Sequence, residues 1–163
     1  MEDSKATGIN GNYFDNSISS AGAAYAFGDP CQVFATASRV GTGCVASGTA
    51  PTLDSTPPRQ GGTCTWTVNS GLINIPGVVL VGIPHLPTAL GFGCTAYFDL
   101  SLLTIPVFFI TDGSGGWTSP AIPVSSAPHI MCSEIAIQAA FDDPNTPPLG
   151  LALSNGVWVR LGN

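Results

Sequence analysis

Charged residues are scarce in this sequence. Of its 163 residues, 9% are Asp, Glu, Lys or Arg, against about 25% in an average soluble domain. The four basic residues (Lys5, Arg39, Arg59 and Arg160) are scattered and the formal net charge is −6, so the phosphates of DNA or RNA would be repelled. We therefore expect no nucleic acid as a partner. A surface with so few charges also lacks the repulsion that keeps monomers apart, which favours assembly.

Membrane and targeting signals are missing as well. No apolar run reaches the ~20 residues that a membrane span needs, so we expect no membrane span. The polar start, Met1 to Lys5, has no apolar core behind it and is not a signal peptide. We expect that a signal has been removed or that the chain belongs to a longer precursor. No Asn-x-Ser/Thr acceptor for N-glycosylation occurs.

Sets of residues that carry catalysis are also lacking. His85 and His129 stand beside prolines, and neither has the nucleophile and orienting carboxylate that a catalytic base requires. We therefore predict that the protein is not an enzyme and has no cofactor.

Metal-binding spacings are absent too, because no Cys-x-x-Cys or Cys/His pattern appears. The one adjacent acidic pair, Asp142–Asp143, precedes a proline-rich turn, and a capped turn is the preferred interpretation. Calcium binding by Asp142, Asp143 and Asn145 is the weaker alternative.

What the sequence has in abundance is turn-forming residues. Twenty Gly and fourteen Pro are spread along the chain, which predicts many short strands and no long helices. Residues 63–68 alternate strictly and place Cys64, Trp66 and Val68 on one face of a half-buried strand. The apolar run 76–83 predicts a strand buried on both faces.

Further strands and turns follow towards the C-terminus. Strands are expected at 94–100, 106–111, 134–141, 149–153 and 157–161. The Gly-rich segment 112–116 predicts a hairpin turn, and Ser154-Asn155-Gly156 predicts another. Eight or nine short strands with frequent turns predict an all-β fold, either a sandwich or a barrel, and a two-sheet antiparallel β-sandwich is the preferred interpretation.

The N-terminal 28 residues differ from the rest in being polar and rich in Gly, Asn and Ser. We divide the chain into an extended arm or repeat fragment, 1–28, and a β-sandwich module, 29–163. Residues 6–27 (ATGINGNYFDNSISSAGAAYAF) resemble part of an FG-GAP repeat, the blade unit of integrin-like propellers. A single blade fragment cannot form a propeller, so the segment is either a truncated remnant or a strand-bearing arm. The predicted strand in it is Ala21, Gly22, Ala23, Ala24, Tyr25, Ala26 and Phe27.

Residues 41–163 carry several short motifs in a specific order. They include Gly41-Thr42-Gly43-Cys44, Gly91-Phe92-Gly93-Cys94, the run 76–82, and Thr111-Asp112-Gly113-Ser114-Gly115. Together they resemble a recurrent extracellular C-terminal module of planctomycetes and other environmental bacteria. The resemblance implies a secreted bacterial β module of unassigned activity, and it makes Cys44 and Cys94 a disulfide pair.

Five cysteines leave one unmatched in any set of pairs. A second bridge among Cys31, Cys64 and Cys132 is possible. Cys64 faces the predicted core, which suits either a buried bridge or a buried free thiol. At least one cysteine is free or paired between chains.

Two tryptophans are the candidates for ligand contact. If Val157, Val159 and Leu161 face the core, Trp158 points away from it and can stack on a sugar ring; Trp117 is a second candidate. Burial of either ring by another layer or a neighbouring subunit is the preferred interpretation.

The leading hypothesis is an extracellular, non-catalytic structural module at the cell surface. It would self-associate into a filament or surface layer by adding the strand 21–27 to a neighbour. The alternative is a glycan-binding β-sandwich attached to a larger secreted protein.

Overall fold

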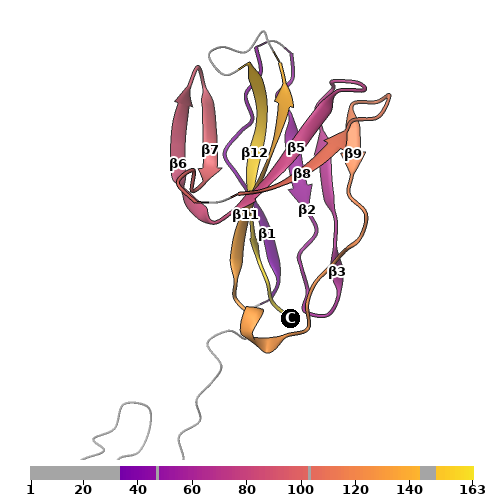
Figure 1. The fold of residues 1–163 in the computed structure, drawn as a ribbon, viewed down its shortest axis with the longest axis vertical. Coiled ribbons are helices and arrows are strands. Elements are labelled where there is room, and N and C mark those ends of the chain that lie inside the picture. Colours follow the sequence, from indigo (N-terminus) through magenta and orange to yellow (C-terminus); the bar gives the residue numbers. More distant parts are fainter. Residues whose placement is uncertain (1–33, 47, 103, 144–149) are drawn as a thin grey trace, which may run out of the picture. The chain divides into compact units, whose positions relative to one another are not determined.

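A computed structural model describes residues 34–46, 48–102, 104–143 and 150–163, which form an all-β fold (Figure 1). The predicted arm, residues 1–28, lies outside the described residues. The strands are β1 (Thr36–Val40), β2 (Thr52–Ser55), β3 (Thr63–Cys64), β4 (Trp66–Asn69), β5 (Pro76–Gly82), β6 (Pro84–Gly91), β7 (Cys94–Phe98), β8 (Ile105–Ile110), β9 (Gly116–Thr118), β10 (Ile122–Pro123), β11 (Glu134–Asp142) and β12 (Leu151–Arg160). A 3-10 turn, η1 (Pro128–Ile130), precedes β11.

Two antiparallel sheets make up the sandwich. The main sheet has five strands in the order β1-β12-β11-β5-β8, and the opposing sheet has the order β2-β4-β9. A further two-stranded pair, β3–β10, is adjacent to the second sheet in sequence: β3 ends at Cys64 and β4 begins at Trp66. The predicted two-sheet antiparallel sandwich is therefore confirmed.

The core lies between these sheets and follows the alternation of the sequence. Leu53, Trp66 and Val68 from the second sheet meet Ile137 and Phe141 from β11. Alternate residues of a strand share one face, so every second side chain of 64–68 and of 135–141 points into this layer. Both alternating patterns were predicted correctly.

A third layer covers the outer face of the main sheet. The β6–β7 hairpin lies over β11 and β12 (Figure 1), where it buries Gln138 to 2% exposure. The hairpin covers β5 only in part, and the exposed fraction of Ile83 is 56%. The prediction that 76–83 is buried on both faces is thus wrong for the outer face, where Val78 and Leu80 are only half-buried because the hairpin lies mainly over β11 and β12.

The predicted turn at Ser154-Asn155-Gly156 does not form. Strand β12 runs unbroken through these residues, and Ser154 and Asn155 together lie opposite Ala139 in a β-bulge. The Asn155 amide instead bridges to the second sheet, accepting from Leu53 N–H (2.9 Å) and donating to Leu53 O (3.0 Å). Asn155 therefore links the two sheets by hydrogen bonds, and the chain does not reverse direction at Asn155-Gly156.

The predicted turn at residues 112–116 does form, but the strands that it connects do not pair with each other. Asp112 N–H donates to Gly116 O (2.7 Å) and Gly115 N–H to Asp112 O (3.0 Å), which closes a tight turn. The strands on either side do not pair with each other, since β8 pairs with β5 and β9 pairs with β4. The prediction of a hairpin is therefore wrong: the turn carries the chain from one sheet to the other.

Candidate functional site

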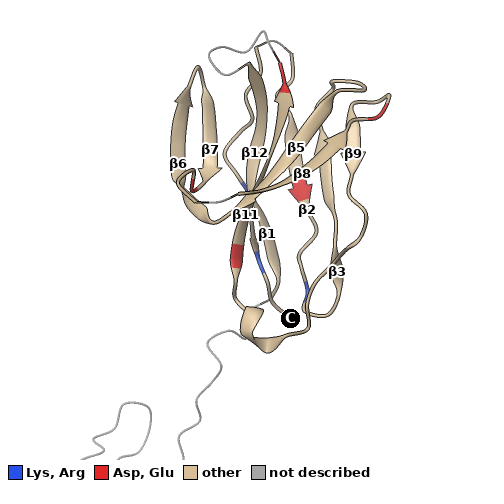
Figure 2. Cartoon of the chain, in the orientation of Figure 1, with Lys and Arg blue, Asp and Glu red and all other residues tan. Residues whose placement is uncertain are grey.

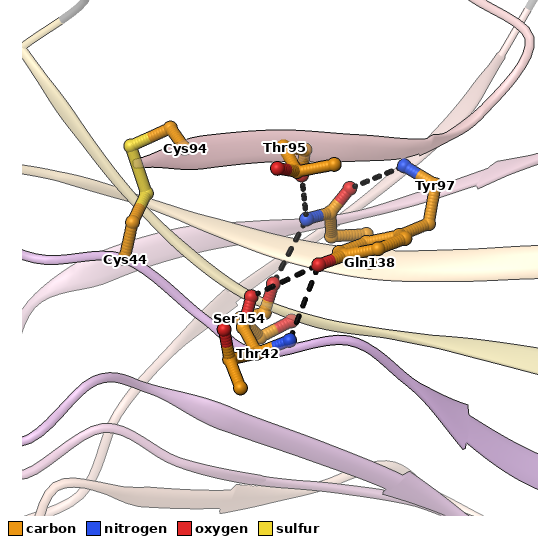
Figure 3. The surroundings of a disulfide bond; sticks show 7 residues. All are labelled: Thr42, Cys44, Cys94, Thr95, Tyr97, Gln138 and Ser154. Carbon is orange, nitrogen blue, oxygen red and sulfur yellow. Dashed lines mark hydrogen bonds between the residues drawn. A yellow bond between two sulfur atoms is a disulfide. The ribbon is translucent and has the colours of Figure 1, made fainter. Parts of the chain in front are cut away.

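The Cys44–Cys94 disulfide ties the β6–β7 hairpin to the main sheet (Figure 3). Cys94 begins β7, while Cys44 exchanges two main-chain hydrogen bonds with Leu153 of β12 (2.8 and 3.0 Å). The pairing implied by the resemblance is confirmed. Cys132 is disulfide-bonded as well, and Cys31 lies outside the described residues.

Gln138 joins the hairpin to the sheet beneath it. Its Nε2 donates to Thr95 O on β7 and to Ser154 O on β12 (both 2.8 Å), and its Oε1 accepts from Tyr97 N–H (3.3 Å). Figure 3 shows the side chain reaching between the two layers. Since every polar atom of the amide is paired, its burial is compensated by hydrogen bonds.

Glycines let Tyr97 lie flat against the main sheet. A Cβ added at Gly156 would lie 2.5 Å from the Tyr97 Cβ, and one at Gly41 would lie 1.9 Å from its hydroxyl oxygen. The Tyr97 hydroxyl accepts from Thr42 N–H (3.1 Å) and donates to Thr42 O (3.2 Å). The hairpin is thus a packed layer held at several points.

A shallow groove lies on the outer face of the main sheet, at the end of this hairpin. Its volume is about 290 Å³, and Thr36, Ser38, Glu134, Trp158 and Arg160 line it. Trp158 points away from the core, as its strand alternation predicts, and its Nε1–H donates to Tyr97 O (3.1 Å). The hairpin therefore covers the indole in part, which agrees with the preferred interpretation of burial by another layer.

The two charged side chains that line the groove pair with each other. Arg160 and Glu134 form an ion pair across β12 and β11. With an aromatic ring, two hydroxyls and one ion pair, the groove offers a stacking face and hydrogen-bonding groups in a neutral setting. Such a surface can bind an uncharged polar molecule.

Trp117 offers no comparable face. Its ring stacks on Phe109 with 4.6 Å between ring centroids, and Phe109 in turn meets Phe141 edge-on at 5.5 Å. The ring packs against the core between the sheets. Trp117 is therefore part of the core layer, and only Trp158 remains beside an open groove.

Cys64 is free and buried. It lines an apolar hollow of about 170 Å³ together with Trp66, Ile135 and Leu161. Burial raises the pKa of the Cys64 thiol, which keeps it protonated and poorly nucleophilic. Of the alternatives left open, the buried free thiol is confirmed for Cys64.

The structure describes two of the three weak calcium candidates, Asp142 and Asp143. Asp142 is exposed at the end of β11, and Asp143 N–H donates to Gly150 O (2.8 Å). Asn145 lies outside the described residues. Within the described ranges, no group of three or more His, Cys, Asp or Glu side chains is placed to hold a metal ion.

A serine, an aspartate and a histidine lie where β6 begins and β7 ends, but not in the order of a hydrolytic triad. Ser101 Oγ donates to Asp99 (2.6 Å), while His85 Nδ1 faces Leu86 O (3.0 Å). A hydrolytic triad needs the histidine between the serine and the carboxylate. Here the hydroxyl of Ser101 and its main-chain N–H lower the pKa of Asp99 directly.

Strand β8 is the surface feature that sequence reasoning missed. Its side chains Ile105, Phe108 and Ile110 are 63%, 79% and 66% exposed. The sequence 105–110 identifies a strand, but only the strand order places it at the edge of the sheet.

Comparison of the chain with protein families, curated proteins and solved structures found no match. The resemblances to a planctomycete module and to an FG-GAP repeat therefore remain predictions. Among the described residues, no helix is long and apolar enough to cross a membrane.

Proposed function

We propose that this chain is an extracellular, non-catalytic assembly module that associates with copies of itself at the cell surface. The observation that carries the proposal is its exposed apolar surface. Ten large hydrophobic residues among those described are between 46% and 84% exposed, on a chain with only 9% charged residues. Three of them, Ile105, Phe108 and Ile110, lie on the single strand β8, and apolar residues that gather on the surface of a folded domain mark interaction surfaces.

Two further features support this proposal. The Cys44–Cys94 disulfide suits an oxidising compartment such as the extracellular space. The strand-like segment 21–27 contains no charged residue, so it can pair with a neighbour's sheet without burying a charge.

The mass of the purified chain in solution tests the proposal, by light scattering with negative-stain images of the same sample. We expect large regular assemblies that are lost when residues 1–28 are removed. The deletion leaves the fold intact, because each described strand begins after Phe34 and keeps its partners. A monomer at all concentrations would overturn the proposal.

The groove beside Trp158 supports a second candidate function, the binding of a surface glycan. Aromatic rings stack on sugar rings, and the hydroxyls of Thr36 and Ser38 with the Glu134–Arg160 pair can bond to sugar hydroxyls. Only Trp158, and not Trp117, lines this groove.

A polysaccharide panel read by tryptophan fluorescence tests this second candidate. The expected result is a shift with one glycan that Trp158→Phe weakens and that Ser114→Ala, a change at the distant Asp112 turn, leaves unaltered. The absence of any shift across the panel would remove the candidate.

A further inference from the structure

Strand β8 has the free edge and the composition of an acceptor for an added strand. It is six residues long, closes the main sheet at one side, and pairs only with β5 among the described strands. Neither β8 nor β5 carries a charge, as Figure 2 shows. An apolar, uncharged edge of this kind can pair with other chains unless something covers it.

The other sheet edges are protected from such pairing. Arg39 lies on β1 and Asp54 on β2, and these two side chains form an ion pair. Strand β9 is only three residues long, and the free strand of the hairpin, β6, contains two prolines. Charges, shortness and proline each discourage edge pairing. Strand β8 has one proline, Pro106, but it carries no charge and is twice as long as β9, which makes it the least protected of these edges.

The main-chain groups of β8 can be assigned to one side or the other. Thr111 N–H donates to Ile75 O (3.0 Å), which makes Thr111 a hydrogen-bonded position facing β5. Such positions alternate in an antiparallel ladder, so Pro106, Phe108 and Ile110 direct their main-chain groups outward. The N–H groups of Phe108 and Ile110 and the carbonyls of all three residues are thereby left for a partner. Pro106 has no N–H, but at this position a main-chain N–H would point away from β5, so the β5–β8 ladder loses no hydrogen bond.

We infer that β8 receives residues 21–27 of a second copy of this chain. Alternation places Ala23, Tyr25 and Phe27 on one face of that segment and smaller residues on the other. The two aromatic rings would extend the outer face beside Phe108, where cross-strand aromatic pairs are favourable. The small side chains would lie inward, where the stacked rings of Phe109 and Trp117 leave little space.

Chain length favours a second copy over the same chain. The described chain begins at Phe34 next to β1, whose neighbour is β12, at the opposite side of the sheet from β8. A strand added to β8 would lie five strand spacings from β1, about 24 Å away. The six residues 28–33 reach that far only when fully extended, at about 3.4 Å for each of seven steps. No length remains for passing around the sheet, whereas a neighbouring copy imposes no such limit.

This inference rests on the assembly proposed above and identifies its acceptor surface. The first test compares Phe108→Lys with the matched control Phe92→Lys. Phe92 is also an exposed phenylalanine (73%), but it lies at the tip of the hairpin away from β8. We expect Phe108→Lys to raise the concentration needed for assembly by at least about tenfold, and Phe92→Lys to leave it unchanged. Circular dichroism verifies that both variants are folded.

The second test addresses the donor segment in the full chain. Ala24→Pro with Ala26→Pro removes two N–H groups from the added strand and is expected to prevent assembly. A fluorescent peptide of residues 20–28 should then bind this variant, as measured by anisotropy. Binding should weaken at least about tenfold when Phe108→Lys is added. Hydrogen exchange at the amides of Phe108 and Ile110 should slow when the peptide binds.

The outcomes separate the two proposals. A wild-type chain that stays monomeric overturns both of them. Assembly that tolerates Phe108→Lys overturns the acceptor role of β8 and leaves the assembly proposal standing. Assembly that is lost in Phe108→Lys but kept in the double proline variant shows that β8 pairs with something other than residues 21–27, such as β8 of a second copy, and overturns the inferred donor.

Discussion

At the scale of single residues, polar side chains in this fold work as connectors between layers. Gln138 links the hairpin to the main sheet, and Asn155 links the main sheet to the second sheet. Their exposed fractions are 2% and 3%. Buried polar groups with all their partners in place fix one arrangement of the layers, since other arrangements would leave those partners unpaired.

Replacing Gln138 by leucine tests this role. The variant keeps the volume but leaves Thr95 O, Ser154 O and Tyr97 N–H without their partner. We expect a loss of at least about 3 kcal/mol in the free energy of unfolding, because three buried groups lose their partner and each such group costs about 1–3 kcal/mol. Urea denaturation measures the loss.

Gln60→Leu is the matched control for this substitution. Gln60 Nε2 donates to Ser126 O (2.8 Å) at the surface, where water can replace the amide. Its loss should cost under about 0.5 kcal/mol. Equal effects of the two substitutions would mean that Gln138 does not hold the layers together.

At the scale of elements, the β6–β7 hairpin is the unit that turns a two-layer sandwich into a three-layer one. Cys94 anchors its second strand, Tyr97 packs on the glycines beneath, and Trp158 bonds to its main chain. The disulfide closes a loop with a sequence separation of 50 residues. It therefore constrains the unfolded chain as well as the hairpin.

Removing the disulfide with Cys44→Ala and Cys94→Ala should lower the free energy of unfolding by about 4 kcal/mol, the chain-entropy value for a loop of this length. Denaturation under non-reducing conditions measures it. Hydrogen exchange should accelerate more at the Tyr97 amide than at Ile137, which lies in the central strand β11. Cys64→Ala, which removes only a free buried thiol, is the control and should cost about 1 kcal/mol. Unchanged stability in the double variant would show that the disulfide plays no structural role.

At the scale of the whole molecule, a small number of carboxyl groups determines how the free energy of unfolding depends on pH. The Arg39 guanidinium lowers the pKa of Asp54, chiefly by hydrogen bonding, and this pair joins β1 of the main sheet to β2 of the second sheet. Hydrogen bonds from Ser114, followed by those from main-chain N–H groups, lower the pKa of Asp112 in the turn between the sheets.

Carboxyl groups with a lowered folded-state pKa stabilise the fold above their unfolded-state pKa of 3.8. That stabilisation is lost as the pH falls through the lower folded-state values. We therefore expect the free energy of unfolding to decrease below about pH 4, as measured by urea denaturation between pH 6 and pH 2.

Asp54→Asn should remove part of this pH dependence. At neutral pH the substitution should cost less than about 1 kcal/mol, because both side chains are roughly half exposed to water. Stability that stays constant or rises on acidification would contradict the assignment.

The sequence by itself determined several strands and their inward faces, although it predicted no strand at β1, β2 or β6 and divided β12 into two. Period-2 alternation identified Trp66 and Val68 as core residues, and the same rule placed Ile137 and Phe141 there. Such patterns are local, because a strand with one buried face must alternate wherever it lies. The Cys44–Cys94 pair was implied by the family resemblance and not by the spacing of the cysteines.

Only the tertiary structure decided which strands pair and what lies over them. Asn155-Gly156 has the composition of a turn, yet Asn155 bonds to Leu53 and Gly156 packs against Tyr97, and β12 continues through both residues. Trp158 alternates like an exposed residue but lies beneath a hairpin, and the apolar strand β8 looks like a core strand but forms an edge. In each case the outcome depends on a partner far away in the sequence, and local patterns carry no information about that partner.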